Sequence, residues 1–159
     1  MTLSVDIKAE GMAIDSLGYY RASYFCSSKG SGISGSASLM NAMFAIELAL
    51  KSIHVKHESK VWGHKIKPLL DSLPSDHKVS IANELRSRWE DFDIQLENCN
   101  NAFVVWRYKY ESKGPITINH FFVLELAELC CRAVIEEFTI SCSPDIPSAI
   151  RRCAPKVNI

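Results

Sequence analysis

The stretch SASLMNAMFAIELALKSI, residues 36–53, decides the fold of this chain. Its apolar residues recur at helical spacing and further apolar residues fill the flank, so it predicts a helix that is apolar on most sides. Such a helix belongs at the centre of a domain. Glu47 and Lys51 are four residues apart and can pair on one face. Because desolvating a charge pair is costly, the pair lies either on a solvent-exposed edge of this helix or in a polar site.

Length and composition predict one folded domain. The chain has 159 residues, of which 47% are hydrophobic, and it contains few Gly and Pro. We expect a single helical domain over residues 1–141 and an extended or disordered tail over residues 142–159, which hold three prolines. The formal net charge is zero, so the overall charge gives no electrostatic argument for nucleic-acid binding.

Cysteine usage and hydropathy predict the compartment. The six cysteines form no C-x-x-C pair, so neither a zinc ribbon nor a thioredoxin-type motif is indicated. The N-terminal residues do not resemble a signal peptide, and no apolar run reaches the ~18 residues that a membrane span needs. These features predict a soluble cytoplasmic protein with reduced thiols and no membrane association.

The remaining helices follow from periodicity and from breaks in the chain. Pro68 suits the first turn of a short helix, whereas Ser75 and Thr117 are expected to cap longer ones. In the last helix, a polar face is predicted from four charged residues at spacings of three and four, namely Glu125, Glu128, Arg132 and Glu136. Glu128 with Arg132, and Arg132 with Glu136, are expected to be ordinary solvent-edge pairs. Together these elements predict an all-α, antiparallel four- to five-helix bundle. Its expected helices cover about residues 6–28, 36–55, 66–73, 76–98 and 118–138.

The histidines raise the question of a metal site. Four of them lie close in sequence, but they lack H-E-x-x-H spacing, and the neighbouring lysines would repel a cation. Surface histidines are therefore the favoured interpretation for His54, His57, His64 and His77. Neither a phosphate-binding P-loop nor a nucleophile elbow occurs, so we expect no metal and no cofactor.

A second group of candidate residues is Trp106–Glu111, where cations alternate with aromatic residues. Arg107 could clamp a phosphate, and Tyr108 and Tyr110 could stack on a base. The favoured alternative is structural. In that interpretation the tyrosines pack on the end of the bundle, and Arg107 pairs with Glu111 or Glu47.

The order of three segments resembles HEPN-domain proteins, a helical-bundle family of prokaryotic defence, toxin–antitoxin and nucleotidyltransferase-associated proteins. The resemblance covers about residues 36–138, and its segments are Ala45–Lys51, Gly63–Leu70 and Arg107–Glu111. It implies a four- or five-helix up-and-down bundle that is often a homodimer. Active members of the family are metal-independent ribonucleases, which use an Arg and a His separated by four to six residues and placed across a dimer cleft.

This chain departs from that motif, because Ser112, Lys113 and Gly114 occupy the positions where the His would stand. The resemblance therefore implies a non-catalytic or degenerate, homodimeric module that binds RNA or a protein partner, in a defence or toxin–antitoxin context. Its expected polar site consists of Glu47, Lys51, His64, Arg107, Tyr108, Tyr110 and Glu111.

Two alternatives remain open. The first is a metal-independent ribonuclease in which His64 or His120 approaches Arg107 in space. His120 lies in the first turn of the last helix, where we expect the helix dipole to lower its pKa. The second is a purely structural dimerisation bundle, in which the polar residues only fix the register of the helices.

Overall fold

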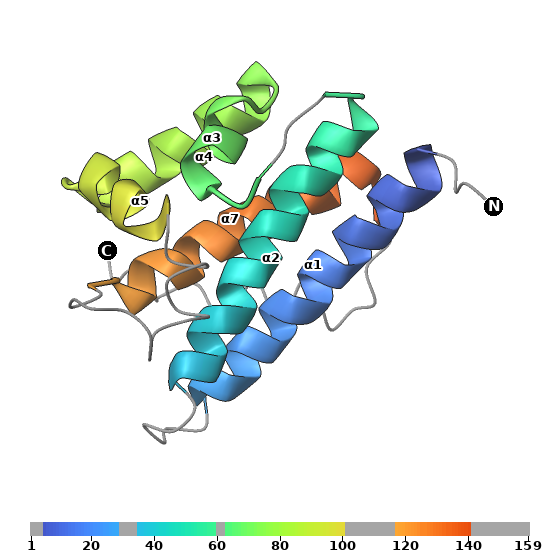
Figure 1. Cartoon of the computed structure of the whole chain (residues 1–159). Helices are drawn as coiled ribbons and strands as arrows, with labels where there is room; N and C mark the ends of the chain where they lie inside the picture. The colour runs from blue at the N-terminus through green and yellow to red at the C-terminus, as the bar shows by residue number, and fades with distance from the viewer. Residues whose placement is uncertain (1–4, 29–34, 60–62, 101–116, 141–159) are drawn as a thin grey trace.

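The predicted all-α fold is confirmed by a computed structural model of the chain, which describes residues 5–28, 35–59, 63–100 and 117–140. Within these ranges there are six helices and no strands (Figure 1). Their bounds are α1 Val5–Ser28, α2 Gly35–Lys56, α3 Ile66–Asp71, α4 Ser75–Arg88, α5 Phe92–Asn100 and α7 His120–Phe138.

Helix α2 lies at the centre, as its sequence predicts. Its apolar face, which includes Met43, Ile46 and Leu50, is completely buried. Helix α1 runs antiparallel beside it, and α7 packs against both (Figure 1). Burying each large apolar side chain contributes about 1.5–3 kcal/mol. The packing of α1, α2 and α7 therefore supplies most of the stability of the fold.

The shorter helices form a second layer. Helix α4 lies on α7 and runs antiparallel to it, since His77 near its start contacts Glu137 and Arg88 at its end contacts Glu125. Helices α3 and α5 contact each other, and α3 also contacts α2 (Figure 1). Along the chain, α1, α2, α4 and α7 thus alternate in direction, which is the order of an up-and-down bundle.

The predicted third long helix is wrong, because the chain forms two helices there. Helix α4 ends at Arg88, and Trp89 adopts extended backbone angles (φ −126°, ψ 100°) before α5 begins at Phe92. The Trp89 indole packs edge-on against Phe122 of α7, with ring centroids 5.6 Å apart. The break thus occurs where the Trp89 side chain packs on α7.

The helix starts also differ from expectation. Ser75 is the first residue of α4, and its hydroxyl contacts Asp76 instead of capping the helix. Asn119, not Thr117, caps α7, because its side-chain oxygen accepts the backbone N–H groups of Phe121 and Phe122. Pro68 lies in the first turn of α3, as predicted, where no backbone donor is needed.

None of the helices in the described ranges combines the length and apolar character that crossing a bilayer requires. The predicted tail, residues 142–159, lies outside the described residues.

Candidate functional site

The structure brings three of the predicted site residues together. The Glu47 Oε1 atom lies 2.6 Å from Lys51 Nζ and 2.8 Å from His64 Nδ1. Glu47 and Lys51 are one turn apart on α2, whereas His64 follows that helix on the connection to α3. We refer to Glu47, Lys51 and His64 as the Glu47 edge. A buried carboxylate thus holds one cation and one imidazole at the surface.

The three side chains differ in exposure. The Glu47 side chain is only 8% exposed, the Lys51 side chain 21% and the His64 side chain 59%. Gly63 directs His64 toward α2, because its φ of +102° gives the chain a turn that other residues rarely adopt. The Glu47 edge therefore has a buried acceptor beneath exposed donors.

One atom of the Glu47 edge is not satisfied. The Glu47 Oε2 atom is buried and has no hydrogen-bond partner in the described part of the chain. An unpartnered buried polar atom costs about 1–3 kcal/mol of stability. Groups that break this rule in folded proteins are concentrated at functional sites. The burial of Glu47 is therefore poorly explained by stability alone.

His120 lies apart from the Glu47 edge. Its Nε2 atom is 3.0 Å from the hydroxyl oxygen of Ser38, and that hydroxyl donates its proton to the Ser23 carbonyl. Nε2 must then be the donor to Ser38. Ser38 and Glu47 are nine residues apart on α2, which corresponds to about 13 Å along the helix. His64 and His120 thus contact side chains in different parts of α2.

The pKa of His120 is lowered, as predicted, but burial of the imidazole is the main cause. The other predicted site residues lie outside the described residues. These are Arg107, Tyr108, Tyr110 and Glu111.

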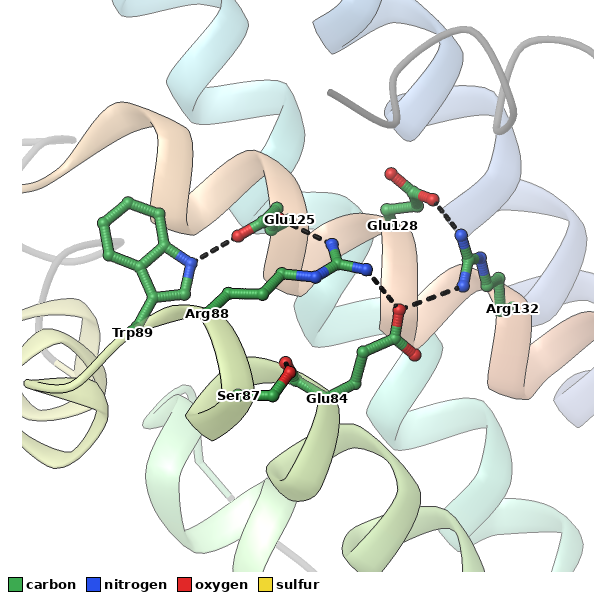
Figure 2. A network of polar contacts seen from close by, with 7 residues as sticks. All are labelled: Glu84, Ser87, Arg88, Trp89, Glu125, Glu128 and Arg132. Atoms are coloured by element: carbon green, nitrogen blue, oxygen red, sulfur yellow. Dashed lines mark hydrogen bonds and ion pairs between the residues drawn. The ribbon is translucent and has the colours of Figure 1, made fainter. Parts of the chain in front are cut away.

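A larger polar network lies between α4 and α7, and the sequence did not predict it (Figure 2). Arg88 donates to Glu125 and to Glu84, each at 2.7 Å. Arg132 donates to Glu84 at 3.3 Å and to Glu128 at 2.5 Å. The indole N–H of Trp89 also donates to Glu125. Three carboxylates and two guanidinium groups therefore join the two helices.

The expectation of a solvent-edge pair is wrong for Glu128 with Arg132, because α4 covers that face of α7. Glu128 is only 3% exposed and Glu125 9%. Burial is the main influence on the Glu128 carboxyl and raises its pKa, although the Arg132 charge opposes the change. The hydrogen bond to Glu125 is the largest influence on Arg88 and raises its pKa. Since the carboxylates are already paired inside the fold, this network holds α4 on α7.

A small cavity of about 70 Å³ lies beside this network. Its polar lining includes His77, Glu84 and Arg132, and its apolar lining includes Leu129. The volume suits a few water molecules and is far below the ~300 Å³ of an ordinary small-molecule site. The cavity therefore gives no argument for a substrate pocket.

The second missed cluster surrounds Glu137 near the end of α7. Its carboxylate lies 3.0 Å from Lys56 Nζ, 3.1 Å from His57 Nε2 and 2.6 Å from His77 Nε2. Burial alone would raise the pKa of Glu137. The hydrogen bonds from His77 and Lys56 outweigh burial and lower the pKa to about 2. We call these four residues the Glu137 clamp, since they join α2, α4 and α7.

The surface interpretation of the histidines is wrong for His54. This residue is 2% exposed, and its Nε2 atom lies 2.8 Å from the Leu69 carbonyl oxygen, to which it donates. It therefore links α2 to α3. Among the residues that the structure describes, no three His, Cys, Asp or Glu side chains gather in a way that could hold a metal ion.

Comparison of the chain with protein-family models, with curated proteins and with solved structures finds no significant match.

Proposed function

We propose that this chain is a HEPN-like, non-catalytic helical module that binds RNA at the Glu47 edge. The observation that carries the proposal is the convergence of Lys51 and His64 on one buried carboxylate. This arrangement fixes Lys51, whose ammonium group can donate to phosphate oxygens, and His64, which can donate from Nε2 when its imidazole is protonated. Phosphate contacts from cations and hydrogen-bond donors supply most of the affinity of proteins for nucleic acid.

The local charge pattern supports this site more than the net charge does. Lys65 follows His64 directly and is exposed, so it can add a second cation beside Lys51. Other cations in this region have acidic partners, since Lys56 pairs with Glu137 and Lys67 with Asp71. The Glu47 edge itself carries no net charge when His64 is neutral, and Lys65 adds one positive charge beside it.

Pre-organisation is the second support. Lys51 is flexible in water, and fixing such a side chain on binding costs about 0.5–1.5 kcal/mol. Because Glu47 already orders Lys51 and His64, part of this cost is met by folding. The burial of the Glu47 carboxylate, although it costs stability, is then explained by this functional role.

The separation of the histidines supports a non-catalytic module. General acid–base cleavage of RNA places both proton-transfer groups within hydrogen-bond reach of one substrate. His64 lies at the Glu47 edge, and His120 contacts Ser38 about 13 Å further along α2. These two histidines cannot act together on one phosphate in this arrangement. By the family resemblance, binding would serve a defence or toxin–antitoxin system.

The proposal is tested by measuring the binding of a fluorescent single-stranded RNA to the purified chain. The double variant Glu47→Leu with Lys51→Met removes the Glu47 edge and leaves the net charge unchanged. We expect at least a tenfold weaker affinity, which is about 1.4 kcal/mol. The wild-type affinity should also fall as salt rises, because phosphate contacts release counterions.

A matched control comes from the exposed pair Arg86 and Asp93, whose charged atoms lie 3.3 Å apart on α4 and α5. The variant Arg86→Met with Asp93→Leu makes the same change of charge away from the Glu47 edge. It should bind RNA like the wild type. Equal losses in both double variants, or no RNA binding by the folded wild type, would overturn the proposal.

A second candidate function is metal-independent RNA cleavage, and one contact favours it. A carboxylate that orients an imidazole, as Glu47 orients His64 at 2.8 Å, is the arrangement of many general bases. RNA cleavage in the presence of a chelator, lost in His64→Gln, would support this candidate against the non-catalytic module. Intact RNA with wild-type affinity would exclude it.

A further inference from the structure

His54 caps the end of α3 from the neighbouring helix α2. Its Nε2 atom donates to the Leu69 carbonyl oxygen at 2.8 Å, and both residues are buried. The last four carbonyl groups of a helix have no partner within that helix. In α3, the other three of these carbonyls accept hydrogen bonds from residues that follow the helix. In the described part of the chain, the Leu69 carbonyl therefore depends on His54.

The His54 ring leaves one of its own atoms without a partner. Because a carbonyl oxygen can only accept, Nε2 carries the proton and Nδ1 keeps a lone pair. Nδ1 is buried and has no hydrogen-bond partner among the residues that the structure describes. An apolar residue at this position would bury no such atom, so packing alone gives no reason for a histidine. The reason lies in the carbonyl that the ring reaches on α3.

Helix α3 depends on its neighbours for its position. It has six residues, and isolated helices shorter than about 12 residues are marginal in water. Its buried apolar side chains hold it on the core, but apolar contact is non-directional and does not fix the rotation of a helix. Two directed hydrogen bonds can fix it. At the start of α3 the Lys67 N–H donates to Asn100 of α5, and near its end the Leu69 carbonyl accepts from His54.

The position of α3 decides the position of His64. Helix α3 begins at Ile66, two residues after His64, and two residues span at most about 7 Å. The His64 ring meets Glu47 at 2.8 Å. Glu47 and His54 are seven residues apart, so they lie two turns apart on the same side of α2. A rotation of α3 would therefore move His64 away from Glu47.

We propose that His54 is a positioning residue of the Glu47 edge, because its hydrogen bond to α3 sets where His64 meets Glu47. His54 is only 2% exposed, so it acts through α3 and not by touching a ligand. The consequence for RNA rests on the proposed function. The coupling between His54 and His64 is a property of the fold and can be measured without RNA.

Amide hydrogen exchange of residues 63–73 tests this coupling. His54→Leu removes the donor and keeps an apolar side chain in the core. Exchange in residues 63–73 should become at least about tenfold faster, while α1, α2 and α7 keep their wild-type rates. His54→Gln keeps an N–H donor near the place of Nε2 and should restore exchange to within about twofold of the wild type.

Three results of this experiment would overturn the proposal. The first is unchanged exchange of residues 63–73 in His54→Leu. The second is equal acceleration in all helices, because His54 would then support the whole fold and not the position of α3. The third is a His54→Gln protein that exchanges like His54→Leu, because the donor would then not be what matters.

His57 provides the matched control. It lies three residues further along the chain, near the end of α2, and it contacts Glu137 of α7 instead of α3. His57→Leu makes the same change of side chain as His54→Leu. It should leave the exchange of residues 63–73 within about twofold of the wild type. Equal acceleration in the two variants would contradict a specific role of His54.

RNA affinity then tests the functional consequence. His54→Leu should weaken RNA binding at least as much as His64→Gln. The variant that carries both changes should bind within about twofold of His54→Leu, because both changes remove the same contact with Glu47. Losses that multiply, or wild-type affinity in His54→Leu, would overturn the positioning role. If the wild type binds no RNA, the proposed function fails, whereas hydrogen exchange still decides whether His54 positions this segment.

Discussion

Replacing Glu137 by glutamine tests the Glu137 clamp. Lowering the pKa of this carboxyl from 4.5 to about 2 stabilises the fold wherever the group is ionised. One pKa unit corresponds to about 1.4 kcal/mol, so the limit is about 3 kcal/mol, and solvent screening reduces it to about 1–2 kcal/mol. Glu137→Gln should therefore lower the unfolding free energy at pH 7 by about this amount.

The pH dependence gives the sharper result. Because the pKa is lowered in the folded state, this stabilisation is present above pH 4.5 and is lost as the pH falls toward 2. Urea denaturation at pH 7 and at pH 3 should show that the difference between wild type and Glu137→Gln shrinks by about half or more. Asp71→Asn, in an exposed pair with Lys67, is the control and should cost under about 0.5 kcal/mol. A difference that does not shrink in acid would refute the reasoning.

Three further outcomes are expected. Arg132→Ala should lower the unfolding free energy by about 3 kcal/mol in urea denaturation, because it leaves the buried Glu128 carboxylate without its closest cation; a loss below 1 kcal/mol would contradict the network. Gly63→Ala should cost about 1 kcal/mol in the same assay, since alanine rarely adopts a φ of +102°, and wild-type stability would count against the turn. Burial raises the pKa of Cys99 to about 12 and also raises those of the two adjacent cysteines of α7. Iodoacetamide should therefore modify Cys26 in the native protein well before it modifies the buried set, and mass spectrometry can check the order for Cys99, Cys130 and Cys131.

The long helices could be predicted from the sequence because the residues that they bury are apolar and recur at helical spacing. Residues 36–53 show this best, and α2 occupies nearly that range. Periodicity failed at Trp89, which continues the apolar spacing of α4 and yet leaves the helix. Its place is decided by Phe122 and Glu125 on α7, more than 30 residues further along the chain. Spacing within one segment carries no information about such a contact.

The polar residues show the same limit. Spacing predicted that Glu128 and Arg132 share a face, and they do. It could not show that α4 buries that face, since Glu84 comes from a different helix. For the Glu47 edge, spacing predicted the pair on α2, while the contact with His64 depends on the turn at Gly63. His64 was predicted to belong to the site from the order of segments along the chain. Neither residue spacing nor expected burial predicted it.

The role of the Glu47 edge is tested most directly by RNA affinity and folding stability measured on the same protein. In the variant Glu47→Leu with Lys51→Met, we expect RNA affinity to fall at least tenfold. Its unfolding free energy should stay within about 1 kcal/mol of the wild type or rise, because a buried ion pair can be replaced by apolar residues without loss. Unchanged RNA affinity together with a large loss of stability would contradict the account, since the Glu47 edge would then be structural.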